Sequence, residues 1–417
     1  MAAQSATLGI DFGTSNSAAG TLQAGRPHLF DVETGSKTLP SAFFFDFDTR
    51  ETLLGTRAVN ALIEGQDGRF MRALKRVLGT SLMHEERLVF GERITFVEII
   101  ARLLRQIKAS AEAQSGHVFD HALSGRPVHF HDNDAAKDKL AEEDLRACYK
   151  AAGFKSVSFM LEPEAAAIAR ASEGNNKSLG LIVDIGGGTS DFSVFETDRS
   201  GDVSIMSNSG ARIGGTDFDR ALSILAVMPL LGKGTLLRKE MGADLTPTPN
   251  AIFNDLATWE KIPFLYNGKT RKMVADMHKL ATEPEKLGRL SEVLTSELGH
   301  DLAFLVEKGK IAANADGDDT QIDLNLLEQG LGAPLSAALL HEALDGFVDT
   351  IKDSVMEAIR AADLTPERID KVVYVGGSSL IGLVHQAIHE MFPGADHAFS
   401  DVFTAVAQGL AIASARA

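Results

Sequence analysis

Cysteine is nearly absent from this 417-residue chain, which contains only Cys148. A single cysteine cannot form a disulfide within the chain, and it excludes a metal site built from several thiolates. Cys148 lies in a stretch with helical periodicity (EEDLRACYKAAGF), where a small buried apolar side chain is its expected role. The lack of a disulfide framework is typical of a protein from a reducing compartment.

Long apolar runs are also lacking. No stretch reaches the roughly 18 apolar residues that a membrane-spanning helix requires. The start of the chain, MAAQSATLGIDFG, lacks the basic and apolar regions of a secretory signal. We therefore expect a cytoplasmic protein with no membrane partner.

Positive charge is in short supply. The chain has 41 Lys and Arg residues against 57 Asp and Glu, a formal net charge of −16. This balance argues against nucleic acid or an anionic membrane as the main partner. The contents of 44% hydrophobic and 24% charged residues are typical of a globular protein, and the length suggests two or more core-forming lobes.

Glycine, by contrast, is clustered in turns that could form anion-binding sites. In LGLIVDIGGGTSDFSVFE (179–196), two apolar runs of strand character flank the turn Gly186, Gly187 and Gly188. Glycine lets another group approach the backbone closely, and successive N–H groups in such a turn form a concave anion site. An ordinary hairpin with a glycine bulge is the alternative for this stretch alone.

The polar residues of this turn indicate which anion it binds. Asp184 and Asp191 would repel a bare phosphate, so an intermediary is needed. Hydrated Mg²⁺ suits them, because it keeps several waters and bridges carboxylates to phosphates. Thr189 adds a hydroxyl donor. The stretch therefore predicts a site for phosphate and Mg²⁺.

A second hairpin of this kind lies near the N-terminus. LGIDFGTSNSAAG (8–20) carries Asp11, Gly13, Thr14 and Ser15 between strand-like runs, and the pattern returns 173 residues later at Asp184. Two related hairpins, one in each half of the chain, suggest a duplicated architecture. Each hairpin could open one lobe, with a ligand held between the two.

The remaining chain alternates between strand and helix patterns. A strand is expected to end at Leu161, where Glu162 and Pro163 start an Ala-rich helix. Helical periodicity is expected over 56–78, 94–114, 134–152, much of 243–310 and 334–362, a short strand over 125–131, and strand, turn and helix over 208–225 and 370–392.

Five motifs taken in order resemble one family: DFGTSNS, the LEP helix start, DIGGGTSD, RIGGTDFD and VGGSSLIG. They resemble the ATPase domain of the 70-kilodalton heat-shock chaperones, in the actin/hexokinase-like superfamily. The version GARIGGTDFDRAL looks most like the shorter YegD-type members. The resemblance implies an α/β fold of two lobes, each with a ribonuclease-H-like mixed sheet flanked by helices, and a nucleotide cleft between them.

The resemblance also implies a domain division. Lobe I would cover 1–173, with a subdomain IB at about 40–110. Lobe II would cover 174–385, with a subdomain IIB at about 214–345, and C-terminal helices at 386–417 would return to lobe I. Because the resemblance covers only the ATPase domain, we expect no peptide-binding domain.

The resemblance assigns catalytic roles to five residues: Lys75, Glu162, Asp184, Thr189 and Asp191. Lys75, in LKRVLG, and Thr189 would lie close to the γ-phosphate. Glu162, in LEPEAAAIA, would help orient the metal's waters and the attacking water. Asp184 and Asp191 would position Mg²⁺-bound and nucleophilic waters.

Further residues are implied to hold ATP or ADP and Mg²⁺. Mg²⁺ would be bound through water by Asp11, Asp184 and Asp191. The phosphate-side contacts are Asp11, Gly13, Thr14, Ser15, Gly186, Gly187 and Gly188, and those toward the α-phosphate and ribose are Gly214, Gly215, Thr216, Gly376, Gly377 and Ser378. In VEKGKIAAN, the candidate adenosine contacts are Glu307, Lys310 and Asn314.

One departure from the family concerns the nucleotide base. The family typically holds adenine between two arginines, and the matching positions here are Ile311 and Leu380. An apolar pair can still bury a base, but it offers no cation–π contribution. The choice of base is therefore left open.

The expected function is that of an ATP-binding, chaperone-like protein, a slow Mg²⁺-dependent ATPase whose lobe closure is read by a protein partner or co-chaperone. A monomer is the simplest expectation. One alternative is a small-molecule kinase of the same superfamily, which would need a catalytic base facing a substrate cleft. Another is a filament-forming, bacterial-actin-like structural protein, which would need self-complementary lobe surfaces.

Overall fold

The structure is a computed structural model, which describes residues 6–132, 134–171, 178–198, 203–239, 244–316, 320–399 and 404–415. The chain forms two compact units. The first comprises Met1–Gly68, Arg72–Gly215 and Val348–Ala417, and the second Arg69–Met71 and Thr216–Phe347. Within the described residues, no helix combines the length and apolar character needed to cross a membrane.

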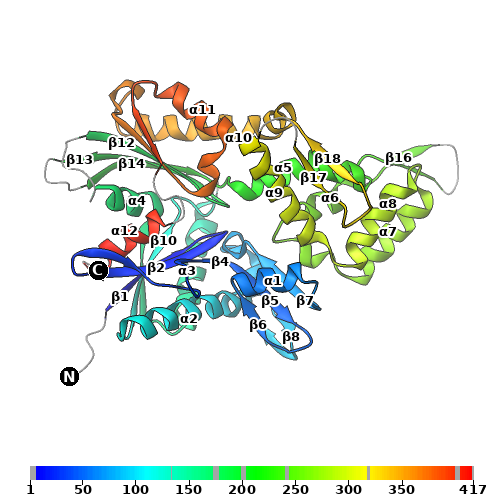
Figure 1. Cartoon of the computed structure of the whole chain (residues 1–417), viewed down its shortest axis with the longest axis horizontal. Coiled ribbons are helices and arrows are strands. Elements are labelled where there is room, and N and C mark those ends of the chain that lie inside the picture. Colours follow the sequence, from blue (N-terminus) through cyan, green and yellow to red (C-terminus); the bar gives the residue numbers. More distant parts are fainter. Residues whose placement is uncertain are drawn as a thin grey trace. The chain divides into compact units, whose positions relative to one another are not determined.

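The first unit contains two mixed sheets of the same design (Figure 1). In the first sheet the strand order is β11-β10-β1-β2-β3, and β4 pairs with β2. β1 runs antiparallel to β2 and parallel to β10. The strands are β1 (Thr7–Phe12), β2 (Asn16–Gln23), β3 (Arg26–Leu29), β4 (Thr38–Pro40), β10 (His121–Arg126) and β11 (Ser156–Leu161).

The second sheet has the same strand order and directions as the first sheet read from β3 to β11. Its order is β14-β13-β12-β19-β20, with β12 antiparallel to β13 and parallel to β19. The strands are β12 (Ser178–Ile185), β13 (Ser190–Thr197), β14 (Val203–Ala211), β19 (Lys371–Val375) and β20 (Asp396–Phe399). Each sheet is thus an antiparallel meander of three strands followed by two parallel strands, so the repeat seen in the two hairpins extends to the sheet topology.

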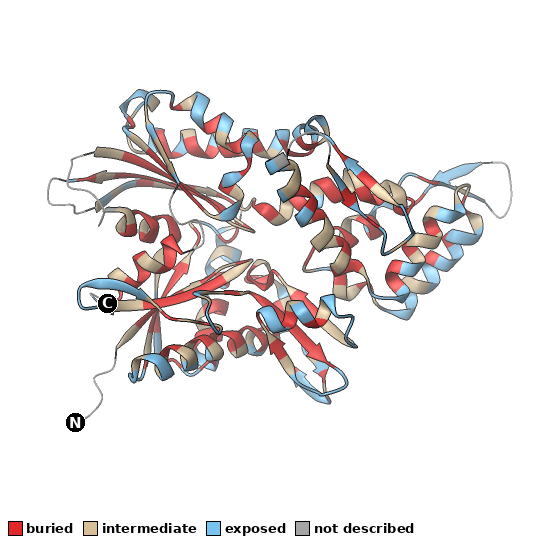
Figure 2. Ribbon diagram, in the orientation of Figure 1, coloured by how far each residue is buried: buried red, intermediate tan, exposed pale blue. Residues whose placement is uncertain are grey.

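Two helices of small residues join these sheets into one core. α4 (Glu162–Ala171) packs on β12, β13 and β14, and α12 (Ala405–Ala413) packs on β1, β2, β3 and β10. The two helices pack on each other, and their buried alanines share a core with residues of β10, β12, β13 and β19. Figure 2 shows this burial along α4, α12 and the strands.

Glycine sets the distance between α4 and α12. A Cβ on Gly409 of α12 would lie 1.7 Å from the carbonyl oxygen of Ala165 in α4. A Cβ on Gly9 of β1 would lie 2.7 Å from the backbone carbon of Leu410. The backbone of α12 therefore lies directly against the backbone of α4 on one side and of β1 on the other. These two contacts set how close α4 and β1 come to α12.

The other elements of the first unit complete its layers. α2 and α3 pack on each other, and α2 starts at a capping box in which Thr95 and Glu98 exchange hydrogen bonds. The other elements of the first unit, α2 and α3 included, are β5 (Ala42–Asp46), β6 (Thr52–Leu54), α1 (Thr56–Ile63), η1 (Leu74–Val77), η2 (Ser81–His84), β8 (Arg87–Val89), β9 (Glu92–Ile94), α2 (Phe96–Ser115), α3 (Ala135–Ala151), η6 (Pro366–Arg368), η7 (Gly377–Leu380) and α11 (Gly382–Met391).

The second unit is mainly helical. Its aromatic core includes Trp259, whose ring lies edge-on to Phe304 with centroids 5.0 Å apart, and Phe70, which lies 5.7 Å from Phe304. Its elements are η3 (Ser223–Val227), η4 (Met228–Leu231), β15 (Leu236–Arg238), β16 (Leu245–Pro247), α6 (Asn250–Leu256), η5 (Ile262–Phe264), α7 (Gly268–Leu280), α8 (Pro284–Thr295), α9 (Gly299–Asp316), β17 (Thr320–Asp323) and β18 (Gly332–Leu335).

Three elements cross the boundary between the units. They are β7 (Gly68–Arg72), α5 (Gly215–Leu222) and α10 (Ala337–Ala361). The domain division implied by the resemblance, with boundaries near 173 and 385, stays a prediction.

Most expected elements are confirmed, and two are wrong. The helix expected over 56–78 ends at Ile63, and Gly65, with φ of 67°, leads toward the strand β7. The strand expected over 125–131 instead ends at Arg126, because Pro127 has no N–H to donate to a sheet. The helices near 94–114 and 134–152 and the helix start at Glu162 are confirmed.

Gly409→Ala is expected to destabilise the protein, because its methyl group would collide with the Ala165 carbonyl. The free energy of unfolding should fall by about 2 kcal/mol or more, the typical effect of overpacking. Gly346→Ala is the matched control, since a Cβ there meets nothing within 4 Å in α10. It should leave stability unchanged or raise it by about 0.5–1 kcal/mol through helix propensity. Urea denaturation of both variants measures the difference, and equal stability would contradict the packing account.

Candidate functional site

The two glycine hairpins have the same backbone geometry. In each, the first residue of the turn donates its N–H to the carbonyl of the fourth: Gly13 to Asn16 at 3.1 Å and Gly186 to Thr189 at 3.0 Å. The strand pairs that close the turns are Phe12 with Ser17 and Ile185 with Ser190. Both hairpins are therefore four-residue turns in the same register.

The two hairpins differ in the residue that lies opposite the acid at the strand end. Asp11 and Asp184 occupy matching positions at the ends of β1 and β12. Across the hairpin, Asp184 pairs with Asp191, whereas Asp11 pairs with Ala18. The second hairpin therefore carries two facing acids, and the first carries one.

The tips of the two hairpins meet within the first unit. A Cβ on Gly187 would lie 2.3 Å from Ser15 Oγ, and a Cβ on Gly188 would lie 2.7 Å from Thr14 Oγ1. A Cβ on Gly214, at the start of the RIGGTDFD turn, would lie 2.5 Å from the Gly188 nitrogen. The two hairpin tips and the RIGGTDFD turn thus come together, and the hydroxyls of Ser15 and Thr14 lie against Gly187 and Gly188.

The VGGSS turn also packs on the second hairpin. Gly376 has a φ of 76°, and a Cβ there would lie 2.4 Å from the carbonyl oxygen of Ile185 and 2.8 Å from Asp184 Oδ1. Ser379 Oγ donates to the Gly376 carbonyl at 2.7 Å. Gly377 and Ser378 begin η7 directly after this turn. On the RIGGTDFD side, Gly215 donates its N–H to the Gly186 carbonyl at 3.0 Å.

A buried ion pair lies beside the hairpins. Lys75, in η1, places its Nζ 2.5 Å from Oε1 of Glu162, the first residue of α4, and both residues are buried. Burial alone would lower the pKa of Lys75, but the carboxylates of Glu162 and Asp11 outweigh it and hold the pKa above its usual value. Lys75 is therefore a fixed positive charge.

Asp11, Asp184 and Asp191 share this buried region, and the single positive charge of Lys75 only partly offsets the effect of burial and of the neighbouring carboxylates on their pKa values. Burial, followed by the nearby charge of Glu162, raises the pKa of Asp11 to about 7 and that of Asp191 to about 8. The same two causes, together with Asp191 and Asp11, raise the pKa of Asp184 well above its ordinary value. Such acids give up their protons when a cation joins them.

The donor set fits a hydrated Mg²⁺ ion. Carboxylates can reach a Mg²⁺ ion through the waters that the ion commonly keeps. Asp11, Asp184 and Asp191 are the residues that would do so.

Two supporting groups were not predicted from the sequence. The backbone N–H of Val128 donates to Asp191 Oδ1 at 2.6 Å, and Ser41 Oγ donates to the Gly13 carbonyl at 2.7 Å. Ser41 also contacts Ser17 Oγ at 2.8 Å. A backbone donor leaves no residue-type signal, and a serine 28 positions away from its partner has no local pattern, so neither could be found from a motif.

The structure groups most of the predicted site residues in the first unit and places four elsewhere. Grouped around the hairpins are Asp11, Gly13, Thr14, Ser15, Lys75, Glu162, Asp184, Gly186, Gly187, Gly188, Thr189, Asp191, Gly214, Gly215, Gly376, Gly377 and Ser378. The second unit contains Thr216, Glu307, Lys310 and Asn314.

In the second unit, Lys310 forms a buried ion pair. Lys310 Nζ lies 2.6 Å from Asp219 Oδ1, and both residues are buried. Ile311 is exposed on the same helix, and Leu380 is exposed at the end of η7 in the first unit. The adenosine-side roles of these residues stay predictions.

The raised pKa values predict how the stability of the nucleotide-free protein depends on pH. Asp191 has an ordinary pKa of 3.8 when unfolded and about 8 when folded, so folding retains its proton between these values. The resulting stability is lost as the pH rises through about 8. Asp191→Asn should therefore stabilise the protein more at about pH 8.5 than at about pH 5, by about 4 kcal/mol, because the pKa of the folded group lies about three units above pH 5. Denaturant unfolding without Mg²⁺ measures this, and a gain independent of pH would contradict it.

Comparison with known proteins agrees with this geometry. The family model described as Hsp70 protein matches residues 7–229 and 302–415. A chaperone protein DnaK of Endomicrobium trichonymphae is 29% identical over 385 residues, covering 91% of this chain and 52% of that protein. A chaperone protein DnaK of Thermoplasma volcanium is 29% identical over 415 residues, covering 98% of this chain and 58% of that protein.

The chain thus spans between half and three fifths of the length of these curated relatives. The family match covers both hairpins, α4 and the VGGSS turn, which are the elements that form the site. It confirms the actin/hexokinase-like α/β fold expected from the order of the motifs. On this evidence, the chain belongs to the Hsp70 family.

Proposed function

We propose that this protein binds ATP and ADP with Mg²⁺ and hydrolyses ATP slowly, in a chaperone-type role. The observation that carries the proposal is the meeting of two equivalent glycine hairpins beside a buried cluster of four acids and Lys75. Membership of the Hsp70 family and the name chaperone protein DnaK of its relatives support the same reading.

The chemistry of the site suits phosphoryl transfer, which needs positioning and charge neutralisation more than covalent catalysis. The turn amides, with Thr14, Ser15 and Thr189, would hold phosphate oxygens. Lys75 would place its positive charge near the γ-phosphate. Mg²⁺, when bound, would neutralise further phosphate charge.

The acids would act through water. Asp11, Asp184 and Asp191 would hold the waters around Mg²⁺. Glu162, which already accepts from Lys75, and Asp191, fixed by the Val128 N–H, would orient the water that attacks the phosphate. Fixed carboxylates and dipoles of this kind stabilise developing charge because they need no reorganisation.

The finer parts of the proposal concern the wider role. We propose a YegD-type member in which a nucleotide-dependent rearrangement of the lobes is read by a protein partner, such as a co-chaperone. We further propose that it acts as a cytoplasmic monomer. With Ile311 and Leu380 at the positions expected to flank the base, selection for adenine would depend on apolar burial.

Calorimetric titration with ATP, ADP and GTP, with and without Mg²⁺, tests the proposal. The wild type should bind ATP only weakly without Mg²⁺. Asp184→Asn should weaken Mg²⁺–ATP binding by about tenfold or more, the loss expected for one charge-assisted contact. Asp396→Asn is the matched control, because it removes an exposed carboxylate from β20 of the same sheet. Absence of nucleotide binding in the wild type would contradict the proposal.

Hydrolysis assays then separate the proposed function from its alternatives. Lys75→Ala should reduce the rate of phosphate release by about a hundredfold or more while binding is weakened less, because its charge is placed for the transition state. Transfer of phosphate to an added metabolite would instead indicate a kinase. Pelleting that depends on ATP would indicate a filament-forming protein.

A further inference from the structure

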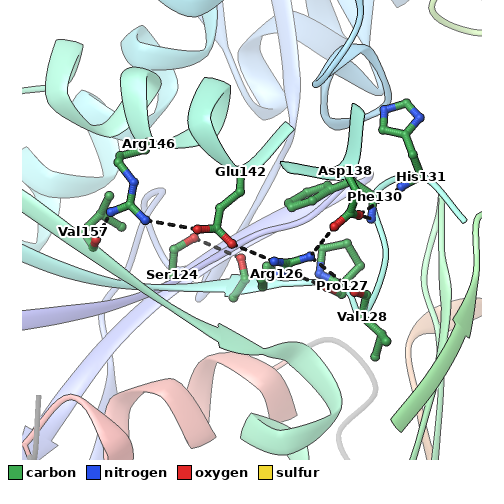
Figure 3. A network of polar contacts seen from close by, with 11 residues as sticks. Ser124, Arg126, Pro127, Val128, Phe130, His131, Asp138, Glu142, Arg146 and Val157 are labelled. Carbon is green, nitrogen blue, oxygen red and sulfur yellow. Dashed lines mark hydrogen bonds and ion pairs between the residues drawn. The ribbon is translucent and has the colours of Figure 1, made fainter. Parts of the chain in front are cut away.

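The segment 127–131, between β10 and α3, has no regular secondary structure, yet it contacts the site. Its Val128 N–H donates to Asp191 Oδ1 at 2.6 Å. Backbone groups outside helices and sheets need other partners when they are partly buried. Here those partners are side chains, and most of them come from α3 and Arg126 (Figure 3).

Arg126, the last residue of β10, lies at the centre of this network. Its Nε donates to the carbonyl of Pro127 at 3.0 Å, and its Nη2 donates to the carbonyl of Val128 at 3.3 Å. Its guanidinium also lies 5.2 Å from the centroid of the Phe130 ring. A single side chain thus holds two successive carbonyls and one ring of the segment.

Two acids of α3 hold the guanidinium in turn. Glu142 Oε2 accepts from Nη1 at 2.6 Å, and Asp138 Oδ2 accepts from Nη2 at 3.2 Å. These acids are four residues apart, one turn of the helix, so both reach the same group. Asp138 also accepts from the N–H of Phe130 at 2.6 Å and of His131 at 3.2 Å. The segment is therefore tied to a rigid helix.

The geometry of the peptide bond connects this network to Asp191. The carbonyl of Pro127 and the N–H of Val128 belong to one planar peptide unit, and the described chain has no cis peptide bond. In a trans unit the two groups point in opposite directions. Arg126 holds the carbonyl side, and Asp191 accepts from the N–H side.

We propose that Arg126 is a positioning residue for Asp191: by fixing the Pro127 carbonyl, it aims the Val128 N–H at Asp191 Oδ1. We name Arg126, Asp138 and Glu142 the arginine clamp. The clamp thereby fixes the Oδ1 atom of the carboxylate. Its effect on hydrolysis rests on the proposed function, whereas its effect on the Val128 amide does not.

The first test measures hydrogen exchange at the Val128 amide in the full chain without nucleotide. Arg126→Met should speed exchange by about tenfold or more, because the amide loses its fixed orientation. Arg126→Lys, which keeps the charge but lacks the planar fork that bonds two carbonyls, should also speed exchange. Arg146→Met is the matched control: Arg146 shares Glu142 at 3.1 Å but bonds the Val157 carbonyl instead of the segment. It should leave exchange at Val128 unchanged.

The second test uses hydrolysis and a double-mutant cycle. Arg126→Met should lower the catalytic rate by about tenfold while the Kd for Mg²⁺–ATP stays within about twofold. In an Asp191→Asn background the same change should have little further effect, because both changes act through one oxygen. A merely structural role would instead give additive losses and weaker binding.

Defined outcomes would overturn the inference. They are unchanged Val128 exchange in both Arg126 variants, equal acceleration in Arg146→Met, and additive losses in the cycle. Circular dichroism checks that each variant is folded. If Arg126→Met is unfolded, Arg126→Lys takes its place in both tests. The exchange test needs no nucleotide, so it decides the role of the clamp even if the wild type fails to hydrolyse ATP, a result that would overturn only the proposed function.

Discussion

Buried negative charge is the constraint on which the site depends. Four carboxyl groups, those of Asp11, Glu162, Asp184 and Asp191, share one region with the Lys75 ammonium. Burial penalises the charged forms of Asp11, Asp184 and Asp191, and nearby like charges add to the penalty, so the pKa values of these three acids are raised. The arrangement is stable only because the surrounding fold holds the groups in place. A bound hydrated cation would offset the repulsion between the carboxylates, and it would also bind phosphate oxygens.

The fold meets this constraint through close packing of backbone. α12 lies against α4 and β1 at glycines, and the two hairpins meet at Gly187 and Gly188. At each of these contacts glycine has no side chain that would hold the facing segments apart. The same helix, α4, begins with Glu162 and continues as the alanine-rich face that packs on α12. Core packing and the placement of the buried ion pair are therefore coupled.

The sequence allowed the hairpins, their acids and most helices to be predicted, because these are local patterns. Asp11 and Asp184 precede glycine turns, whereas Lys75 and Glu162 were assigned through the resemblance of LKRVLG and LEPEAAAIA to motifs of the chaperone family. The rest depends on contacts distant in sequence. The Val128 N–H has no residue-type signal, and the Arg126 contacts with α3 become apparent only once strand and helix are adjacent. The helical periodicity expected over 56–78 was broken by Gly65 and a strand, because tertiary pairing overrode the local pattern.

The most direct test of the central claim is to count the protons released when the preformed Mg²⁺–ATP complex binds. Calorimetric titration near pH 7 in buffers of different ionisation enthalpy gives this number. If a cation completes the buried acidic cluster, acids that hold protons in the free protein must ionise, and net release should be on the order of one proton per nucleotide. Binding with no proton exchange, or with proton uptake, would contradict the account.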